Sequence, residues 1–112
     1  MVKPLSRPYS RYTSDALALL GQLVREARLA KSLTTADLAA RAGISRALLQ
    51  RIERGDQGCS IGAVFEVASI CGLPLFAQDQ RELASKLALQ REKMALLPKS
   101  VRTSAIDVND DF

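Results

Sequence analysis

The 112-residue sequence contains no histidine and no tryptophan, and it has only three phenylalanines and two tyrosines. Without histidine, Ser-His-Asp and Cys-His nucleophile arrangements are excluded, as are His-based metal sites. A core with so few aromatic residues must consist of Leu, Ile, Val and Ala, a mixture that favours helices over a sandwich or a barrel. The sequence therefore predicts an all-α protein that is not an enzyme and needs no metal or cofactor.

Cysteine is also scarce. Cys59 and Cys71 are the only two cysteines, and they form neither a CxxC pair nor a pattern behind a secretory signal. We expect reduced thiols and a cytoplasmic protein, and a redox switch through a Cys59–Cys71 disulfide is the alternative. No apolar run approaches the roughly 20 residues that span a bilayer, so we expect no membrane partner.

The charges are unevenly distributed along the chain. The net charge of +4 comes from 16 Lys and Arg against 12 Asp and Glu, which permits binding to nucleic acid without requiring it. Residues 1–12 carry three basic residues and no acidic one, whereas the last residues are Asp110, Asp111 and Phe112. We expect a flexible basic arm over 1–12, which either touches phosphates or is simply solvated, and a flexible acidic tail over 99–112.

Between these ends, apolar spacing, capping residues and glycine stops predict one domain of four helices over residues 13–76 and an amphipathic helix within 77–98. The expected helices are Ser14 to Ala30, Thr35 to Ala42, Arg46 to Arg54, a fourth helix capped by Ser60, and Gln80 to Leu97. The fourth helix should bury Ile61, Val64, Phe65 and Ala68. The stretch from Leu73 to Phe76 fits either an edge strand or irregular packing.

The segment from Thr34 to Gly55 has the parts of a helix-turn-helix, in which a second short helix projects side chains into the major groove of DNA. Gly43 turns the chain and Ile44 fills the angle between the two helices. The outer face of the second helix carries a set of residues with no acidic side chain beside them: Arg46, Ala47, Gln50 and Arg51. Arg pairs well with guanine and Gln with adenine, so this face predicts base reading, and an ordinary αα-hairpin with solvated arginines is the alternative.

Residues 17–75 resemble the lambda-repressor-like, or XRE, helix-turn-helix family. The resemblance rests on Leu38-Ala39, Gly43-Ile44-Ser45 and Ile52-Glu53-Arg54-Gly55 at the family spacings. It implies base contacts near Ser45, Arg46, Ala47, Gln50 and Arg51, phosphate contacts near Thr35 and Arg54, and an ion pair between Arg28 and Glu53. Family members commonly have Gln where this chain has Thr35, so that phosphate contact is weaker or comes from the helix N-terminus itself.

A protein of this size usually dimerises, so that two recognition helices lie about 34 Å apart on a near-palindromic operator in double-stranded DNA. The last helix is a candidate interface with a second copy or a partner, and packing on its own domain is the alternative. The candidate interface residues are Leu75, Phe76, Leu83, Leu87, Met94 and Phe112.

The order of features after the helix-turn-helix resembles HipB-type antitoxins. These features are Arg54-Gly-Asp56, Ile61-Gly62, Leu73-Pro-Leu75, the basic amphipathic helix and Leu97-Pro-Lys99 before the acidic end. The resemblance implies a homodimer that represses its own operon and binds a HipA-type kinase toxin. The alternatives are a stand-alone phage-type or housekeeping repressor, and a protein-binding adaptor with little affinity for DNA.

Overall fold

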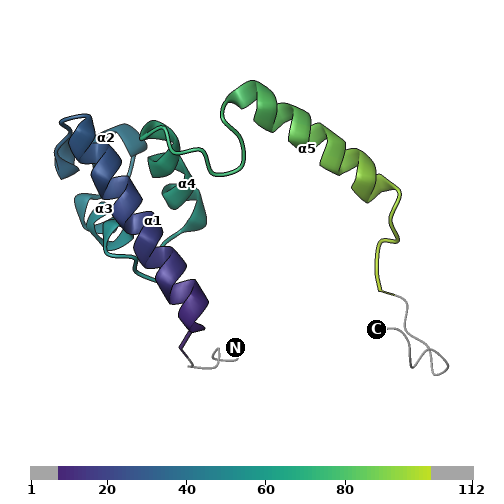
Figure 1. The fold of residues 1–112 in the computed structure, drawn as a ribbon, viewed down its shortest axis with the longest axis horizontal. Helices are drawn as coiled ribbons and strands as arrows, with labels where there is room; N and C mark the ends of the chain where they lie inside the picture. The colour runs from purple at the N-terminus through teal and green to yellow at the C-terminus, as the bar shows by residue number, and fades with distance from the viewer. Residues whose placement is uncertain (1–7, 102–112) are drawn as a thin grey trace. The chain divides into compact units, whose positions relative to one another are not determined.

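The structure, a computed structural model, describes residues 8–101. Figure 1 shows that this part of the chain is all α, as predicted, with no strand among the described residues. The helices are α1 (Arg11–Ala30), α2 (Thr35–Ala42), α3 (Arg46–Glu53), α4 (Ile61–Ile70) and α5 (Gln80–Ala95). The chain divides into two compact units, one that ends at Leu75 and one that begins at Phe76.

Helix α1 begins about one turn earlier than predicted. Ser10, rather than Ser14, is its N-cap, and the Ser10 hydroxyl accepts a hydrogen bond from the Thr13 backbone N–H at 3.3 Å. Arg11 and Tyr12, which we assigned to the basic arm, are therefore helical. The first turn is exposed and buries no apolar side chain, so hydrophobic periodicity could not detect it. Lys3 and Arg7, the other basic residues of the arm, lie outside the described residues.

The core of the first unit is built by one or more residues from each of its four helices. Val24 of α1, Leu38 of α2, Leu49 of α3 and Val67 of α4 are fully buried. Residues 24 and 28 are one turn apart on α1, so the inward position after Val24 is occupied by Arg28, whereas the apolar Leu29 is exposed. An ionisable side chain at a core position indicates a specific partner.

The connection between α2 and α3 is fixed by hydrogen bonds at both helix ends. Gly43 has φ +70°, a conformation that costs other residues more than glycine, and it reverses the chain so that the Ile44 N–H donates to the Ala39 carbonyl at 3.0 Å. Two residues after Gly43, the Ser45 hydroxyl accepts from the Leu48 N–H at 3.0 Å and caps α3. The turn therefore sets the angle at which α3 leaves α2.

The predicted buried face of helix α4 is correct in part. Ala68 is buried and Val64 packs against the core, as predicted, but Ile61 and Phe65 are exposed, at 72% and 37%, and the buried residue beside Ala68 is Val67. Almost every position of this helix is apolar, so composition alone could not select the inward face. After α4 the chain is irregular rather than an edge strand, and Leu73 packs against the core.

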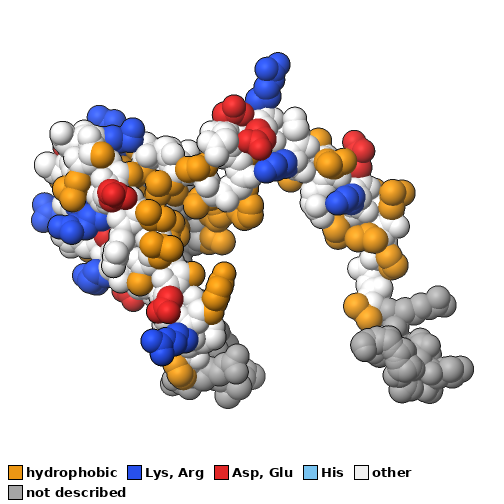
Figure 2. All heavy atoms as spheres, in the orientation of Figure 1, with side chains coloured by type: hydrophobic (Ala, Val, Ile, Leu, Met, Phe, Trp, Pro, Cys, Tyr) orange, Lys and Arg blue, Asp and Glu red, His pale blue; other side chains and the backbone are white. Residues whose placement is uncertain are grey.

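The second unit contains α5, which is capped by its own neighbours in sequence. The Asp79 carboxylate accepts from the Glu82 N–H at 2.8 Å, and Lys86 Nζ donates to the Phe76 carbonyl at 2.8 Å. The helix ends at Ala95, two residues before the predicted Leu97, and none of its residues is buried. Figure 2 shows hydrophobic side chains exposed along it between charged ones. No helix in residues 8–101 is long and apolar enough to cross a membrane.

Candidate nucleic-acid interface

The exposed face of α3 carries most of the residues that sequence analysis assigned to base reading. Arg46 and Gln50 are exposed, and Ser45 and Ala47 are exposed beside them at the N-terminal end of the helix. Residues three or four positions apart share a helix face, so Arg46 and Gln50 project together. The opposite face of α3 is anchored in the core by buried Leu49 and Ile52. The packing that buries one face of α3 thus presents the other to solvent.

Positively charged side chains lie near this face. Figure 2 shows Lys and Arg side chains over the part of the first unit where Figure 1 places α2 and α3. Arg54, the C-cap of α3, has 67% of its side chain exposed. Thr35 is half-buried as the first residue of α2, where backbone N–H groups point out of a helix and attract anions. Both ends of the motif therefore offer groups suited to phosphate.

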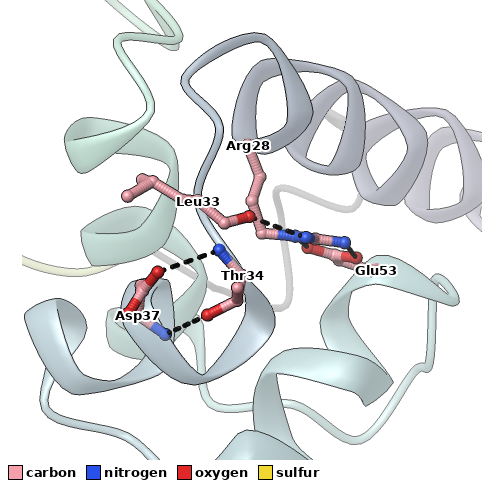
Figure 3. A network of polar contacts seen from close by, with 5 residues as sticks. All are labelled: Arg28, Leu33, Thr34, Asp37 and Glu53. Carbon is pink, nitrogen blue, oxygen red and sulfur yellow. Dashed lines mark hydrogen bonds and ion pairs between the residues drawn. The ribbon is translucent and has the colours of Figure 1, made fainter.

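A buried ion pair joins α1 to the end of α3, as the family resemblance implied. Arg28 donates from Nε to Glu53 Oε2 at 2.7 Å and from Nη2 to Glu53 Oε1 at 3.0 Å, and each side chain is less than 10% exposed. A third hydrogen bond, from Nη1 to the Leu33 carbonyl at 3.0 Å, adds the α1–α2 connection (Figure 3). The bidentate hydrogen bond with Glu53 raises the pKa of the Arg28 guanidinium. This network fixes the position of α3 relative to α1.

Figure 3 also shows the start of α2, where Thr34 and Asp37 form a capping box. The Thr34 N–H donates to Asp37 Oδ2 at 3.1 Å, and the Asp37 N–H donates to Thr34 Oγ1 at 3.0 Å. The hydrogen bond from the Thr34 backbone holds the pKa of Asp37 below its ordinary value. The capping box orders the first turn of α2, which begins at Thr35.

The prediction that no acidic side chain lies beside Arg46, Ala47, Gln50 and Arg51 is wrong, because Asp56 lies at the edge of the exposed face of α3. Arg51 is half-buried, and its Nε forms an ion pair with Asp56 Oδ2 at 2.9 Å. The two residues are five positions apart, outside the three- and four-residue separations that bring side chains together on a helix. Their contact depends on how the chain folds back after α3, which periodicity does not describe.

The candidate interface residues of the second half of the chain are exposed where they are described. The exposed fractions are 39% for Leu75, 67% for Phe76, 41% for Leu83, 47% for Leu87 and 55% for Met94. Phe112 lies outside the described residues.

The cysteines are both free thiols. Cys71 is buried at the end of α4, and this burial raises the pKa of its thiol. No group of three or more Cys, Asp or Glu residues in the described part of the chain could hold a metal ion.

Comparisons with known proteins give two findings. The profile of a family described as a helix-turn-helix domain matches residues 19–84, more than half of the chain. Among solved structures, the restriction-modification controller protein C.AhdI from Aeromonas hydrophila is 32% identical, over 51% of this chain and 86% of that chain, with a TM-score of 0.47. No curated protein matches the chain. The family match includes all of α2, α3 and α4.

Proposed function

This chain belongs to the helix-turn-helix domain family, and we propose that it is a transcriptional repressor that binds a near-palindromic operator in double-stranded DNA as a homodimer. The observation that carries the proposal is the exposed face of α3, on which Arg46 and Gln50 lie together opposite the buried Leu49 and Ile52. Arg and Gln are the side chains that pair bidentately with guanine and adenine in the major groove. Helix α4, by contrast, contains no basic residue and exposes Ile61 and Phe65.

The proposed contacts divide into base reading and backbone positioning. Ser45, Arg46, Ala47, Gln50 and Arg51 are the proposed base-reading residues, because they occupy the exposed side or edge of the recognition helix. Thr35 and Arg54, at the start of α2 and the end of α3, are proposed to contact phosphates. The buried Arg28–Glu53 pair supports this arrangement by holding α3 at one angle.

The homodimer is proposed because one recognition helix gives limited affinity for DNA. Helix α5 buries none of its residues, and Leu83, Leu87 and Met94 are spaced four and seven positions apart on it. That spacing places the three side chains on one stripe, as in helices that pair with a second helix. Leu75 and Phe76, which precede this helix in the sequence, are the other described residues proposed for an interface.

The more specific proposal is an antitoxin that represses its own operon and binds a HipA-type kinase toxin in the cytoplasm. It is supported by the order of features from Arg54-Gly-Asp56 to the acidic end at Phe112, which resembles HipB-type antitoxins. A stand-alone repressor would share every feature of the first unit, and an adaptor would share the fold without the DNA affinity. In each of these roles the chain is not itself an enzyme.

Co-purification of the tagged full chain, expressed from its native operon, distinguishes the three roles. A stoichiometric companion of kinase size, detected by size-exclusion chromatography with light scattering, would support the antitoxin. A lone dimer that binds its own promoter would instead identify a stand-alone repressor. A companion protein without any binding to promoter DNA would leave only the adaptor.

A further inference from the structure

Arg51, at the edge of the reading face, has a guanidinium that is already held by another residue. Asp56 Oδ2 lies 2.9 Å from Arg51 Nε and 3.8 Å from Arg54 Nη2. One carboxylate therefore faces two arginines of the proposed DNA surface. All three side chains remain partly exposed, at 42% for Arg51, 39% for Asp56 and 67% for Arg54. The contact thus lies at the surface that DNA would approach.

The end of α3 fixes the position of Asp56. Gly55 has φ +77°, its N–H donates to the Ile52 carbonyl at 3.0 Å, and the Asp56 N–H donates to the Arg51 carbonyl at 3.0 Å. This is a Schellman motif, which brings the residue after the glycine back over the last turn of the helix. A Cβ on Gly55 would lie 2.8 Å from the Ala18 Cα, so the close approach of α1 as well as the positive φ favours glycine there.

The same backbone arrangement ends the three other helices of the first unit, but with a different side chain. The residues that follow the left-handed Ser32, Gly43 and Gly72 at the ends of α1, α2 and α4 are Leu33, Ile44 and Leu73, and all three pack against the core. After α3 the equivalent residue is Asp56, whose side chain contacts the guanidinium of Arg51. The residue after the left-handed position is apolar and packs against the core at the other helix ends. At the end of α3 this residue is charged and lies at the exposed face of the helix.

A second feature confines the far end of Arg51. A Cβ on Gly58 would lie 3.1 Å from Arg51 Nη2, so the backbone of the loop after α3 runs close beside the guanidinium. Asp56 contacts the Nε side and Gly58 flanks Nη2. The guanidinium is therefore restricted in position while its exposed edge keeps N–H donors available.

We propose that Asp56 is a specificity-determining residue that orients Arg51 toward one base pair and reduces the attraction of Arg51 and Arg54 to phosphate on any sequence. This inference rests on the proposed DNA-binding function. Holding Arg51 in place before binding lowers the conformational entropy that a base contact would cost. The carboxylate also repels phosphates, which weakens binding to DNA of unrelated sequence. Both effects increase the ratio of operator affinity to non-specific affinity.

The ionisation of Asp56 agrees with this role. The hydrogen bond from Arg51 holds the pKa of the Asp56 carboxyl below its ordinary value, so the carboxylate stays charged at neutral pH. The same contact raises the pKa of Arg51.

The test uses the full chain and a duplex sequence selected by the wild-type protein from a random pool. Binding of Asp56→Asn, Arg51→Ala and the double variant is measured by fluorescence anisotropy on the selected duplex, on its single-base-pair variants and on unrelated DNA. We expect Asp56→Asn to lower the ratio of affinity for the selected duplex to affinity for unrelated DNA by about 2- to 10-fold. This is the size of the effect expected when one long side chain is no longer ordered before binding. It should flatten the preference at the same base pair as Arg51→Ala, and it should have no further effect at that base pair when Arg51 is already Ala.

The control is Glu66→Gln, which also removes one negative charge but from an exposed position on α4. If Asp56→Asn and Glu66→Gln changed the ratio equally, the proposal would be overturned and only net charge would matter. Gly58→Ala keeps the charge and displaces the tip of Arg51, so an unchanged preference at that base pair would also contradict it. A wild-type protein that selects no sequence would instead reject the proposed DNA-binding function itself.

Discussion

Among the described residues of the first unit, Arg28 is the one charged residue that is buried, and it affects stability through its ion pair with Glu53. Removing one member of a buried pair leaves the other charged and desolvated, which typically costs about 3–5 kcal/mol. We predict a loss of that size in the free energy of unfolding for Arg28→Ala, measured by urea denaturation. The exposed Arg25→Ala, one turn earlier on α1, is the matched control and should change stability little.

Replacing both members of the pair separates the effect of the ion pair from the effect of packing. Arg28→Met with Glu53→Leu removes both charges together, so it should be far less damaging than Arg28→Ala. Equal losses in the single and double variants would show that packing, rather than the ion pair, explains the effect.

Single residues also show where sequence reasoning ends. The family signature identified Glu53 and Arg28 as partners although they are 25 positions apart, because the resemblance supplied the fold. The family resemblance did not indicate the Arg51–Asp56 contact. It arises from a left-handed glycine that folds the chain back onto the helix, and neither charge nor spacing indicates that a carboxylate returns to the face of α3 that is proposed to read DNA.

At the scale of elements, the capping box of α2 makes stability depend on pH. The hydrogen bond from the Thr34 N–H lowers the pKa of Asp37 in the folded state, so its contribution is complete above the unfolded pKa of about 3.9 and is lost as the pH falls through the lower folded pKa. We predict that the difference in unfolding free energy between the wild type and Asp37→Asn is constant near neutrality and shrinks below about pH 4. Urea denaturation across this range measures it, and a difference that stayed constant in acid would contradict the account.

The contact between α1 and α3 depends on Gly21. A Cβ there would lie 2.5 Å from the Glu53 carbonyl oxygen and 2.7 Å from that of Ile52, and backbone atoms cannot move aside as a side chain can. We predict that Gly21→Ala destabilises the protein by about 1–3 kcal/mol, even though Ala is the better helix former. Gly62→Ala in α4 is the matched control, since its Cβ would meet only Ser60 Oγ at 3.9 Å, and it should be neutral or stabilising. A stabilising Gly21→Ala would show that the helices are not in such close contact.

The elements were predictable to the degree that their ends carry local signals. The bounds of α2 and the start of α3 followed from Thr34, Gly43 and Ser45, because caps and left-handed glycines act within a few residues. The start of α1 did not follow, and neither did the burial of Val67 or the exposure of Ile61 and Phe65 in α4. An exposed first turn has no apolar pattern, and a helix apolar on nearly all sides has no single apolar face until its neighbours pack against it.

For the whole molecule, the proposed dimer makes α5 responsible for affinity as well as assembly. We predict that Leu87→Asp converts the dimer to a monomer in light scattering and weakens operator binding, because one recognition helix then binds alone. Leu89→Asp is the matched control, since Leu89 is 58% exposed but lies off the stripe of Leu83, Leu87 and Met94. If both variants remained dimeric, the interface would lie elsewhere.

The most direct test of the central claim, that the exposed face of α3 reads DNA sequence, compares Arg46→Ala with Arg54→Ala. Each variant is titrated at several salt concentrations against a duplex selected by the wild-type protein, its single-base-pair variants and unrelated DNA. We predict that Arg46→Ala costs about 1–3 kcal/mol and relaxes the preference at one base pair, whereas Arg54→Ala weakens binding to every sequence and lowers the salt slope by about one unit. If Arg46→Ala weakened binding to all sequences equally, α3 would not be the reading element.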